Sequence, residues 1–530
     1  MGAVRRLGRT GLALVIVVAL TSALGALMLG PGNALRLAVA GVSNAALDPF
    51  AEHVRDNGLP VLAVFVDPAQ LASLQADLPF SGGRYVPAEV RAMGMTFPAE
   101  FRYRGLVLTT HYLGDKRSFR LKLGKRNPFA PYRKLDILNP KTPDLLHDRI
   151  ATLLAARLGV DAPALAFVNV RLNDQPYGLM EAMERIDGRF ERLRGRAKKQ
   201  VPVFKGDSPA LSSRALPKGR PLWADAAHWQ YESDADSAAA REHLRAVVAW
   251  INGPDSSRQE LDTLARLLDS DAFARYSALV QLLGTWHIDN YHNQWLVEGA
   301  DARFRPVLWD AHPGYDRGLM PIHSAHDALI VRLMDHGDWR LQRDRILYRA
   351  WHELHEQRAF DALYSAQVAL IRPAVLMDRN RATMLTDDAM HVHRTSAIQW
   401  ARATDRFRDE LHAVWDRLRP GFRINELHVG RTDSTLHIRS SGEPALRMEH
   451  AEGTATLSIA GSGTYYLDTL PPVVIVHPVM RAADQAREDI YAMWNYRVAE
   501  PVDVTLHIAR DVPAALRFFN AVTDEEITPN

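Results

Sequence analysis

The hydrophobic pattern of this chain changes twice along its length, and these changes limit what it can fold into. Apolar and polar residues alternate with a period of two in several segments before residue 184 and again after residue 424. Between residues 226 and 418 the apolar residues mostly recur three and four positions apart, as in amphipathic helices. At 530 residues the chain is also too long for one ordinary core. The pattern therefore predicts an α+β protein with several domains.

Individual elements follow from the same patterns. A helix is expected over residues 145–158, with Gly159 as its natural end. The other elements expected in the first half are strands at residues 60–66, 119–123, 166–172 and 178–183, a short helix at 68–75 and a hairpin over 97–108. The alternating segments after residue 424 predict a small β-sandwich with one helix near residues 483–494.

The first forty residues carry a signal for the membrane. Arg5, Arg6 and Arg9 precede an uncharged, largely apolar stretch at residues 10–35, which is long enough to cross a bilayer. Basic residues before this stretch and few after it predict a single-pass protein of the inner (plasma) membrane, with its main domain outside the cytoplasm. The alternative is a secreted protein, because residues 38–40 (Ala-Val-Ala) could form a cleavage site for a signal peptidase.

Composition excludes several functions. The net charge is only +2, so no nucleic-acid partner is expected. The absence of cysteine excludes thiol catalysis, thiolate metal sites and disulfides. The sequence lacks a nucleophile elbow and a His-Glu-x-x-His motif, and pairs such as His287 with His292 fit no recognised zinc spacing. We therefore expect the histidines to be ordinary polar or core residues.

Two carboxylates and an amide near the middle of the chain point to a specific chemistry. Asp289 is followed four residues later by Asn293, and Asp310 comes directly after the strand-like run Val-Leu-Trp. Kinases use such a set: one carboxylate accepts the proton of the substrate hydroxyl, while the Asn and the other carboxylate hold magnesium ions that bridge the nucleotide phosphates. Together with a strand-rich part followed by a helical part, the set predicts a two-lobed, kinase-like architecture.

Three stretches together resemble the CotH kinase family. They are residues 116–148, which include KRSFRLK and KLDILN, residues 170–206, which include VRLNDQPYGLM and VFKG, and residues 286–310, which end in PVLWD. The resemblance covers roughly residues 60–420 in the order and spacing of the family. It implies a divergent, protein-kinase-like fold that uses ATP and a divalent metal ion, Mg²⁺ or Mn²⁺, to phosphorylate Ser or Thr hydroxyls of a protein substrate.

The resemblance also implies roles for particular residues. Asp289 would be the catalytic base, and Asn293 and Asp310 would be the metal ligands. Four residues are candidates for binding the nucleotide, and the sequence does not rank the lysines among them: Lys116, Lys122, Glu184 and Lys205. Together with the hydrophobic pattern, the match predicts an anchor at residues 1–40, a strand-rich lobe at 47–225, a helical lobe at 226–420 and the sandwich at 421–530.

One position departs from the family pattern. The family usually has a second acid two residues after the Asp that corresponds to Asp310, and this chain has His312 there. The first hypothesis is a membrane-anchored kinase that acts on an envelope or surface protein. The missing acid keeps open an alternative, a non-catalytic scaffold for envelope or surface assembly that retains the fold.

Overall fold

The protein is described by a computed structural model, in which two compact units form. The described residues are Leu27 and residues 57–78, 80–105, 116–140, 142–206, 221–253, 266–285, 287–291, 293–313, 322–325, 327–378, 380, 382–384, 392–394, 397–482, 495–508 and 516–530. Unit 1 comprises Met1–Leu146, Ala166–Met183 and Ala366–Arg406, and unit 2 comprises His147–Leu165, Glu184–Ser365 and Phe407–Asn530. The chain thus passes between the units several times. The domain boundaries expected from the sequence stay a prediction.

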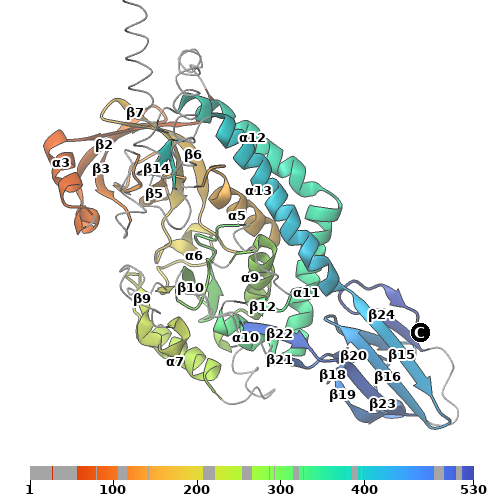
Figure 1. Ribbon diagram of the computed structural model, residues 1–530. Helices are drawn as coiled ribbons and strands as arrows, with labels where there is room; N and C mark the ends of the chain where they lie inside the picture. Colours follow the sequence, from red (N-terminus) through yellow and green to blue (C-terminus); the bar gives the residue numbers. More distant parts are fainter. Residues whose placement is uncertain are drawn as a thin grey trace, which may run out of the picture. The chain divides into compact units, whose positions relative to one another are not determined.

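Unit 1 is built on a sheet that closes on itself, whose strands β2, β3 and β5 are labelled in the orange part of Figure 1. Around the closed barrel the order is β1 (Val61–Val66), β2 (Val86–Ala92), β3 (Met95–Tyr103), β4 (Phe119–Leu123), β5 (Lys134–Leu138), β7 (Gln175–Glu184) and β6 (Leu165–Leu172). Parallel pairing of β1 with β6, which sets Leu62 opposite Val170, completes the ring. Alternate residues such as Val64, Phe101 and Phe119 are fully buried in its interior.

A tight hairpin lies just before residues 97–108, over which the sequence predicted one. Its strands are β2 and β3, and the turn between them consists of Met93 and Gly94, which both have positive φ angles of 50° and 73°. Two consecutive left-handed residues suit the twist of a tight hairpin. Of the residues predicted to form a hairpin, 97–103 lie in the single strand β3, and 106–108 lie outside the described residues. Helix α3 (Pro68–Ala76), in contrast, lies where the sequence predicted a short helix, with Asp67 as its N-cap.

A buried ion pair ties distant segments of unit 1 together. The Nζ atom of Lys116 lies 2.6 Å from the Oδ2 atom of Asp378, and both side chains are almost fully buried. The same oxygen accepts a hydrogen bond from the backbone N–H of Leu179, at 3.0 Å. A Cβ atom at Gly178 would lie 2.3 Å from the Asp378 carboxylate, so only glycine permits this close approach. Asp378 directly follows helix α12 (Ala359–Met377).

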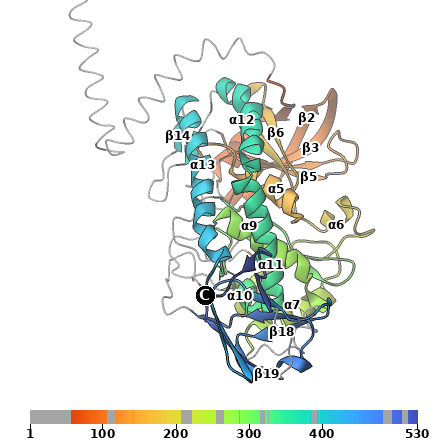
Figure 2. The ribbon, with the colours of Figure 1, turned by 90° about the vertical axis from the view of Figure 1, so that its right-hand side faces the viewer.

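Unit 2 contains the region with the predicted site. Its first sheet has the order β11 (Phe304–Pro306), β10 (Gln294–Glu298), β8 (Val203–Gly206) and β9 (Trp229–Tyr231). Figure 2 shows helix α9 (Ser270–Leu283) packed against α11 (Gly337–Trp351). The other helices of this unit are α5 (His147–Leu158), α6 (Phe190–Leu193), α7 (Ala238–Ile251) and α10 (Ala328–Met334), and α12 and α13 (Ala397–Leu418) have residues in both units.

The last hundred residues form two sheets that share an apolar core, as the alternation of the sequence predicted. The first sheet has the order β15 (Ile424–Arg431), β16 (Thr435–Gly442), β23 (Val502–His507) and β19 (Ser462–Tyr466). The second has the order β18 (Thr456–Ala460), β20 (Val473–His477), β17 (Leu446–Glu449), β24 (Arg517–Asn520) and β25 (Glu526–Ile527). The helix expected near residues 483–494 lies outside the described residues.

The mixed α+β class is therefore confirmed, while the two-lobed kinase-like arrangement stays a prediction. Across the part of the chain that the structure describes, no helix is both long enough and apolar enough to span a bilayer. The anchor predicted in residues 1–40 lies outside that part, apart from Leu27.

A buried imidazole connects three segments of unit 2. Nε2 of His323 lies 2.8 Å from Asp344 on α11, and its Nδ1 lies 2.7 Å from Glu443, which follows β16. Burial alone would lower the pKa of His323, but Asp344 and Glu443 outweigh this effect and raise the pKa above the ordinary 6.5. Burial alone would raise the pKa of Asp344, but His323 and Arg343 lower it to about 2. The ring is thus held as an imidazolium between two carboxylates.

We predict that His323→Gln lowers the free energy of unfolding by about 3 kcal/mol at pH 6, because the buried Asp344 loses one of its two cationic partners and keeps only Arg343, and Glu443 loses its contact with the ring. Because folding raises the pKa of His323, its contribution is complete below the unfolded pKa and is lost as the pH rises through the folded pKa. Urea unfolding of the full chain between pH 6 and 9 should show wild-type stability approaching that of the variant. His428→Gln, at an exposed imidazole 3.8 Å from Glu426, is the control and should change stability by less than about 0.5 kcal/mol.

Candidate functional site

The predicted motif lies in a loop that begins where helix α9 ends. Gly284 ends the helix with a left-handed φ of 57°, and a Cβ atom there would lie 2.7 Å from the side chain of Val414. The hydroxyl oxygen of Thr285 then accepts a hydrogen bond from the backbone N–H of His287, at 3.1 Å. The glycine therefore allows both the end of the helix and the close packing that fixes the start of the loop.

Asp289 is fully buried within this loop. Its Oδ1 accepts a hydrogen bond from the backbone N–H of Tyr291 at 2.7 Å, and its backbone carbonyl accepts one from the Gln294 side chain at 2.6 Å. A second buried carboxyl group belongs to Asp327: burial raises the pKa of Asp327 to about 7, and the negative charge of Asp289 adds to the rise. Asp289, the predicted base, thus stabilises the loop, and its carboxylate is covered by protein.

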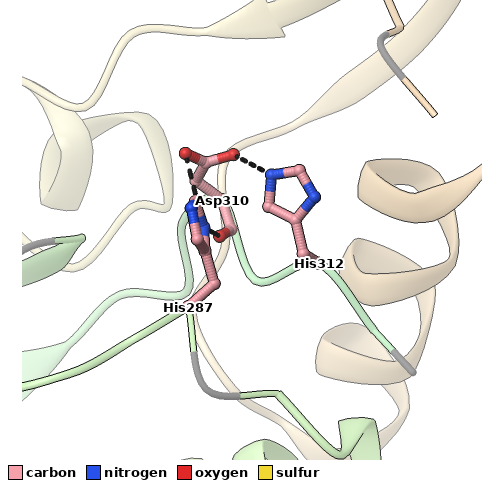
Figure 3. Close-up of side chains that lie close together, drawn as sticks. All are labelled: His287, Asp310 and His312. Atoms are coloured by element: carbon pink, nitrogen blue, oxygen red, sulfur yellow. Dashed lines mark hydrogen bonds and ion pairs between the residues drawn. The ribbon is translucent and has the colours of Figure 1, made fainter. Parts of the chain in front are cut away.

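Three side chains form a compact cluster at the same loop, which we call the His–Asp–His cluster: His287, Asp310 and His312. Figure 3 shows the Asp310 carboxylate between the two rings. Its Oδ1 lies 3.0 Å from Nε2 of His312, and its Oδ2 lies 3.7 Å from Nδ1 of His287. The ring centroids are 4.3 Å apart. The three side chains are 23%, 38% and 23% exposed in that order, so solvent reaches the cluster.

Asn293 borders the same cluster. Its side-chain amide nitrogen lies 3.0 Å from both Nδ1 and the backbone carbonyl oxygen of His287. The backbone carbonyl oxygen of Asp310 lies 2.7 Å from the same Nδ1 atom. The structure therefore brings Asn293 and Asp310, the two predicted metal ligands, to one imidazole, although neither is shown to bind a metal.

The backbone around the cluster is unusual. Asn293, Asp310 and His312 have φ angles of 62°, 50° and 41°, in the left-handed region that residues other than glycine seldom occupy. Such conformations carry a cost and persist where the surrounding structure holds them, often at functional sites. Their concentration in two short segments makes this the leading candidate site among the described residues.

One of the three predicted lysines lies near this region of unit 2. Lys205 on β8 is directly opposite Trp295 on β10, and its Nζ lies 6.0 Å from the centre of that ring. The Trp295 ring in turn lies 5.9 Å from the ring of Trp309, the residue before Asp310. Strand pairing thus places Lys205 at the sheet that carries both site segments, and its role in binding phosphate stays a prediction.

The other predicted nucleotide-binding residues have partners elsewhere. Lys116 belongs to the buried pair with Asp378, and Lys122 pairs with Glu100 at 2.8 Å on the exposed face of the barrel. Glu184 is buried and accepts hydrogen bonds from the Arg194 guanidinium, at 2.9 Å and 3.0 Å. In these positions the three residues make structural contacts, and their assignment to the nucleotide stays a prediction.

The donor atoms of the His–Asp–His cluster fit a divalent cation. One ligand atom from each of His287, Asp310 and His312 lies within 4.8 Å of the others, and Asn293 presents its amide nitrogen to His287. Sequence reasoning missed the two histidines because it compared His287 only with His292. The available signal was that His312 stands where the resemblance led us to expect a second acid, because an imidazole at that place can also bind a metal ion.

Comparisons with known proteins agree with the resemblance found in the sequence. A family model described as CotH kinase protein matches residues 101–411. The inner spore coat protein H of Bacillus subtilis (strain 168) is 22% identical over 333 residues, which is 61% of this chain and 89% of that protein. A solved complex of the Shewanella oneidensis MR-1 toxin–antitoxin proteins HipA and HipB with operator DNA aligns over 68% of this chain and 72% of the matched chain, with 12% identity and a TM-score of 0.28.

We predict different stability effects for the two lysines of unit 1. Lys116→Met should lower the free energy of unfolding by about 3 kcal/mol or more, because it leaves the Asp378 carboxylate buried without its cation. Lys122→Met removes an exposed pair and should cost less than about 1 kcal/mol. Urea unfolding of both variants measures the difference. Equal effects would show that the Lys116 pair contributes no more to stability than a surface contact.

Proposed function

Because the chain belongs to the CotH kinase protein family, we propose that it transfers the terminal phosphoryl group of ATP to a Ser or Thr hydroxyl of an envelope or surface protein. The observation that carries the proposal is the meeting of Asn293 and Asp310 at His287, in the same loop as Asp289. This is the combination of amide, carboxylate and nearby second carboxylate that kinase-type transfer requires.

In this proposal each residue has one task. The substrate oxygen attacks the terminal phosphorus of ATP, the bond to the bridging oxygen breaks, and ADP leaves. Asp289 accepts the proton of the attacking hydroxyl, and Lys205 places a positive charge against the phosphates. Asn293 and Asp310 hold Mg²⁺ or Mn²⁺, which would supply charge neutralisation at the phosphate oxygens when bound.

The burial of Asp289 sets a condition for this mechanism. A general base must come within hydrogen-bonding distance of the hydroxyl that it deprotonates, and the Asp289 carboxylate is covered by protein. Binding of the substrates must therefore open the loop around Tyr291, whose backbone N–H donates to Asp289. Such tightening and rearrangement of catalytic contacts on binding is common in enzymes.

Two observations, one on Asp289 and one on His312, favour a second candidate, a non-catalytic scaffold in envelope or surface assembly. Asp289 already has a structural task as an acceptor for the loop backbone, and His312 replaces the second acid of the family pattern. A scaffold needs the fold and not the transfer chemistry. The two candidates differ in a single measurable property, the transfer of phosphate.

We further propose that residues 1–40 anchor the protein as a single-pass segment in the plasma membrane, with the described units outside the cytoplasm. The support is the sequence pattern of basic residues followed by a long apolar stretch. Secretion after cleavage of the same segment is the alternative. A reporter fused after Asn530 distinguishes the cytoplasmic side from the outer side, and N-terminal sequencing of the mature protein detects cleavage.

We predict that the purified protein transfers ³²P from labelled ATP to a protein acceptor or to itself in the presence of Mg²⁺ or Mn²⁺. Asp289→Asn should lower the rate by about 10²- to 10⁴-fold, because the amide cannot accept the proton. Asp310→Asn should lower it at least tenfold, because the site loses the carboxylate at its centre. The measurement is the initial rate of label transfer.

Asp271→Asn is the matched control for these variants. Asp271 is an exposed carboxylate of α9 that pairs with Arg275, so its loss leaves the loop intact and the rate unchanged. Thermal unfolding of all variants verifies that they are folded. Equal label transfer by wild type, Asp289→Asn and Asp310→Asn would contradict the assigned roles, and ATP binding without any transfer by the wild type would favour the scaffold.

A further inference from the structure

We infer that the His–Asp–His cluster is a site for a transition-metal dication of the class that binds imidazole, such as Zn²⁺, Fe²⁺ or Co²⁺, in preference to Mg²⁺. The inference deepens the proposed function, because it names the metal class of the same site, and it rests on that function only for what the metal would do. The binding itself depends on three side chains of this chain: His287, Asp310 and His312.

The spacing of the donor atoms suits one shared cation. Ligand atoms bound at about 2.0–2.2 Å from the same ion lie roughly 3–4 Å from one another. The Asp310 carboxylate oxygens meet this spacing on both sides, at 3.0 Å from His312 Nε2 and 3.7 Å from His287 Nδ1. Figure 3 shows a dashed contact from Asp310 to each ring, and the carboxylate is therefore placed to share an ion with each of them.

The chemistry of the ligands selects the class of metal. Mg²⁺ prefers oxygen ligands in octahedral geometry, and imidazole nitrogen suits Zn²⁺, Fe²⁺, Ni²⁺ and Cu²⁺. Two of the three ligands in the cluster are imidazoles, and one of them, His312, stands where an acid would have supplied oxygen. Exchange of an oxygen ligand for nitrogen weakens Mg²⁺ binding and strengthens binding of the later transition metals.

The backbone conformation at Asp310 and His312 also supports a shared metal site. Asp310 and His312 both adopt left-handed conformations, which direct two ligands that are two residues apart to one point. The backbone carbonyl oxygen of Asp310 lies 2.7 Å from Nδ1 of His287, so two oxygen atoms of this residue face the same imidazole nitrogen. A ring N–H that donates to the carbonyl oxygen accounts for this contact, so a metal ion at Nδ1 would replace that proton, and the partial exposure of the three side chains gives an ion access.

The test is metal binding by the full chain without nucleotide. After treatment with a chelator, the protein is titrated with Co²⁺, followed by its visible ligand-field absorption, and with Zn²⁺ and Mg²⁺ by competition. We expect Co²⁺ and Zn²⁺ to bind at least about 100-fold more tightly than Mg²⁺. His287→Gln and His312→Gln should each weaken Co²⁺ binding about 100-fold, the upper end of the losses seen when supporting residues of metal sites are removed.

Two further variants make the test specific. His312→Asp, which restores an acid at this position, should lower the preference for Co²⁺ over Mg²⁺ at least about tenfold. His243→Gln removes an imidazole that lies 2.5 Å from the single carboxylate Glu298, outside the cluster, and should leave Co²⁺ affinity unchanged. Far-ultraviolet circular dichroism of each variant verifies that the protein is folded.

Unchanged Co²⁺ affinity in both His287→Gln and His312→Gln, or Mg²⁺ binding as tight as Co²⁺ binding in the wild type, overturns the inference. Its failure is distinct from failure of the proposed function. Tight, histidine-dependent Co²⁺ binding without phosphate transfer supports the metal site and rejects the kinase. Transfer driven by Mg²⁺, with Co²⁺ affinity insensitive to the two histidines, supports the kinase and rejects the metal class inferred here.

Discussion

The pairing of strands β10 and β11 is the constraint on which the candidate site depends. Antiparallel register places Leu296 opposite Pro306, so the first residues of β10 and the last residues of β11 lie at the same end of this strand pair. Asn293 directly precedes β10, and Asp310 follows β11 after the hydrogen bond from Val307 N–H to the Trp295 carbonyl. A one-residue slip would move every side chain to the other face. The sheet thus holds the amide and the carboxylate where the loop after α9 brings His287 to them.

Family membership and local chemistry give complementary information about this protein. Membership of the family supports the proposal of phosphoryl transfer. The position of Asp289, Asn293 and Asp310 in one unit of the structure agrees with it. The local chemistry departs from the family pattern at His312, which lies against the central carboxylate and next to a second imidazole. A single exchange of acid for histidine therefore both weakens the case for Mg²⁺ and strengthens the case for another dication. The metal class that we infer for the cluster depends on this histidine.

Local patterns predicted much of the fold. Strands β1, β4, β6 and β7 and helix α5 lie where alternation or helical periodicity placed them, because such patterns depend only on neighbouring residues. Contacts between distant residues were not predictable in this way. The Lys116–Asp378 pair joins residues 262 positions apart. The folded chain brings His287 next to Asp310, 23 residues away. A rule based on the spacing of histidines in the sequence does not predict this contact.

The most direct test of the central account is an anomalous-scattering map of crystals grown with Co²⁺ and a non-hydrolysable ATP analogue. The account predicts a cobalt peak within about 2.2 Å of an Asp310 carboxylate oxygen and of a histidine nitrogen of the cluster. It also predicts that the triphosphate lies between this ion and Lys205. A cobalt peak at other residues, with the triphosphate bound away from Asp310, would contradict it.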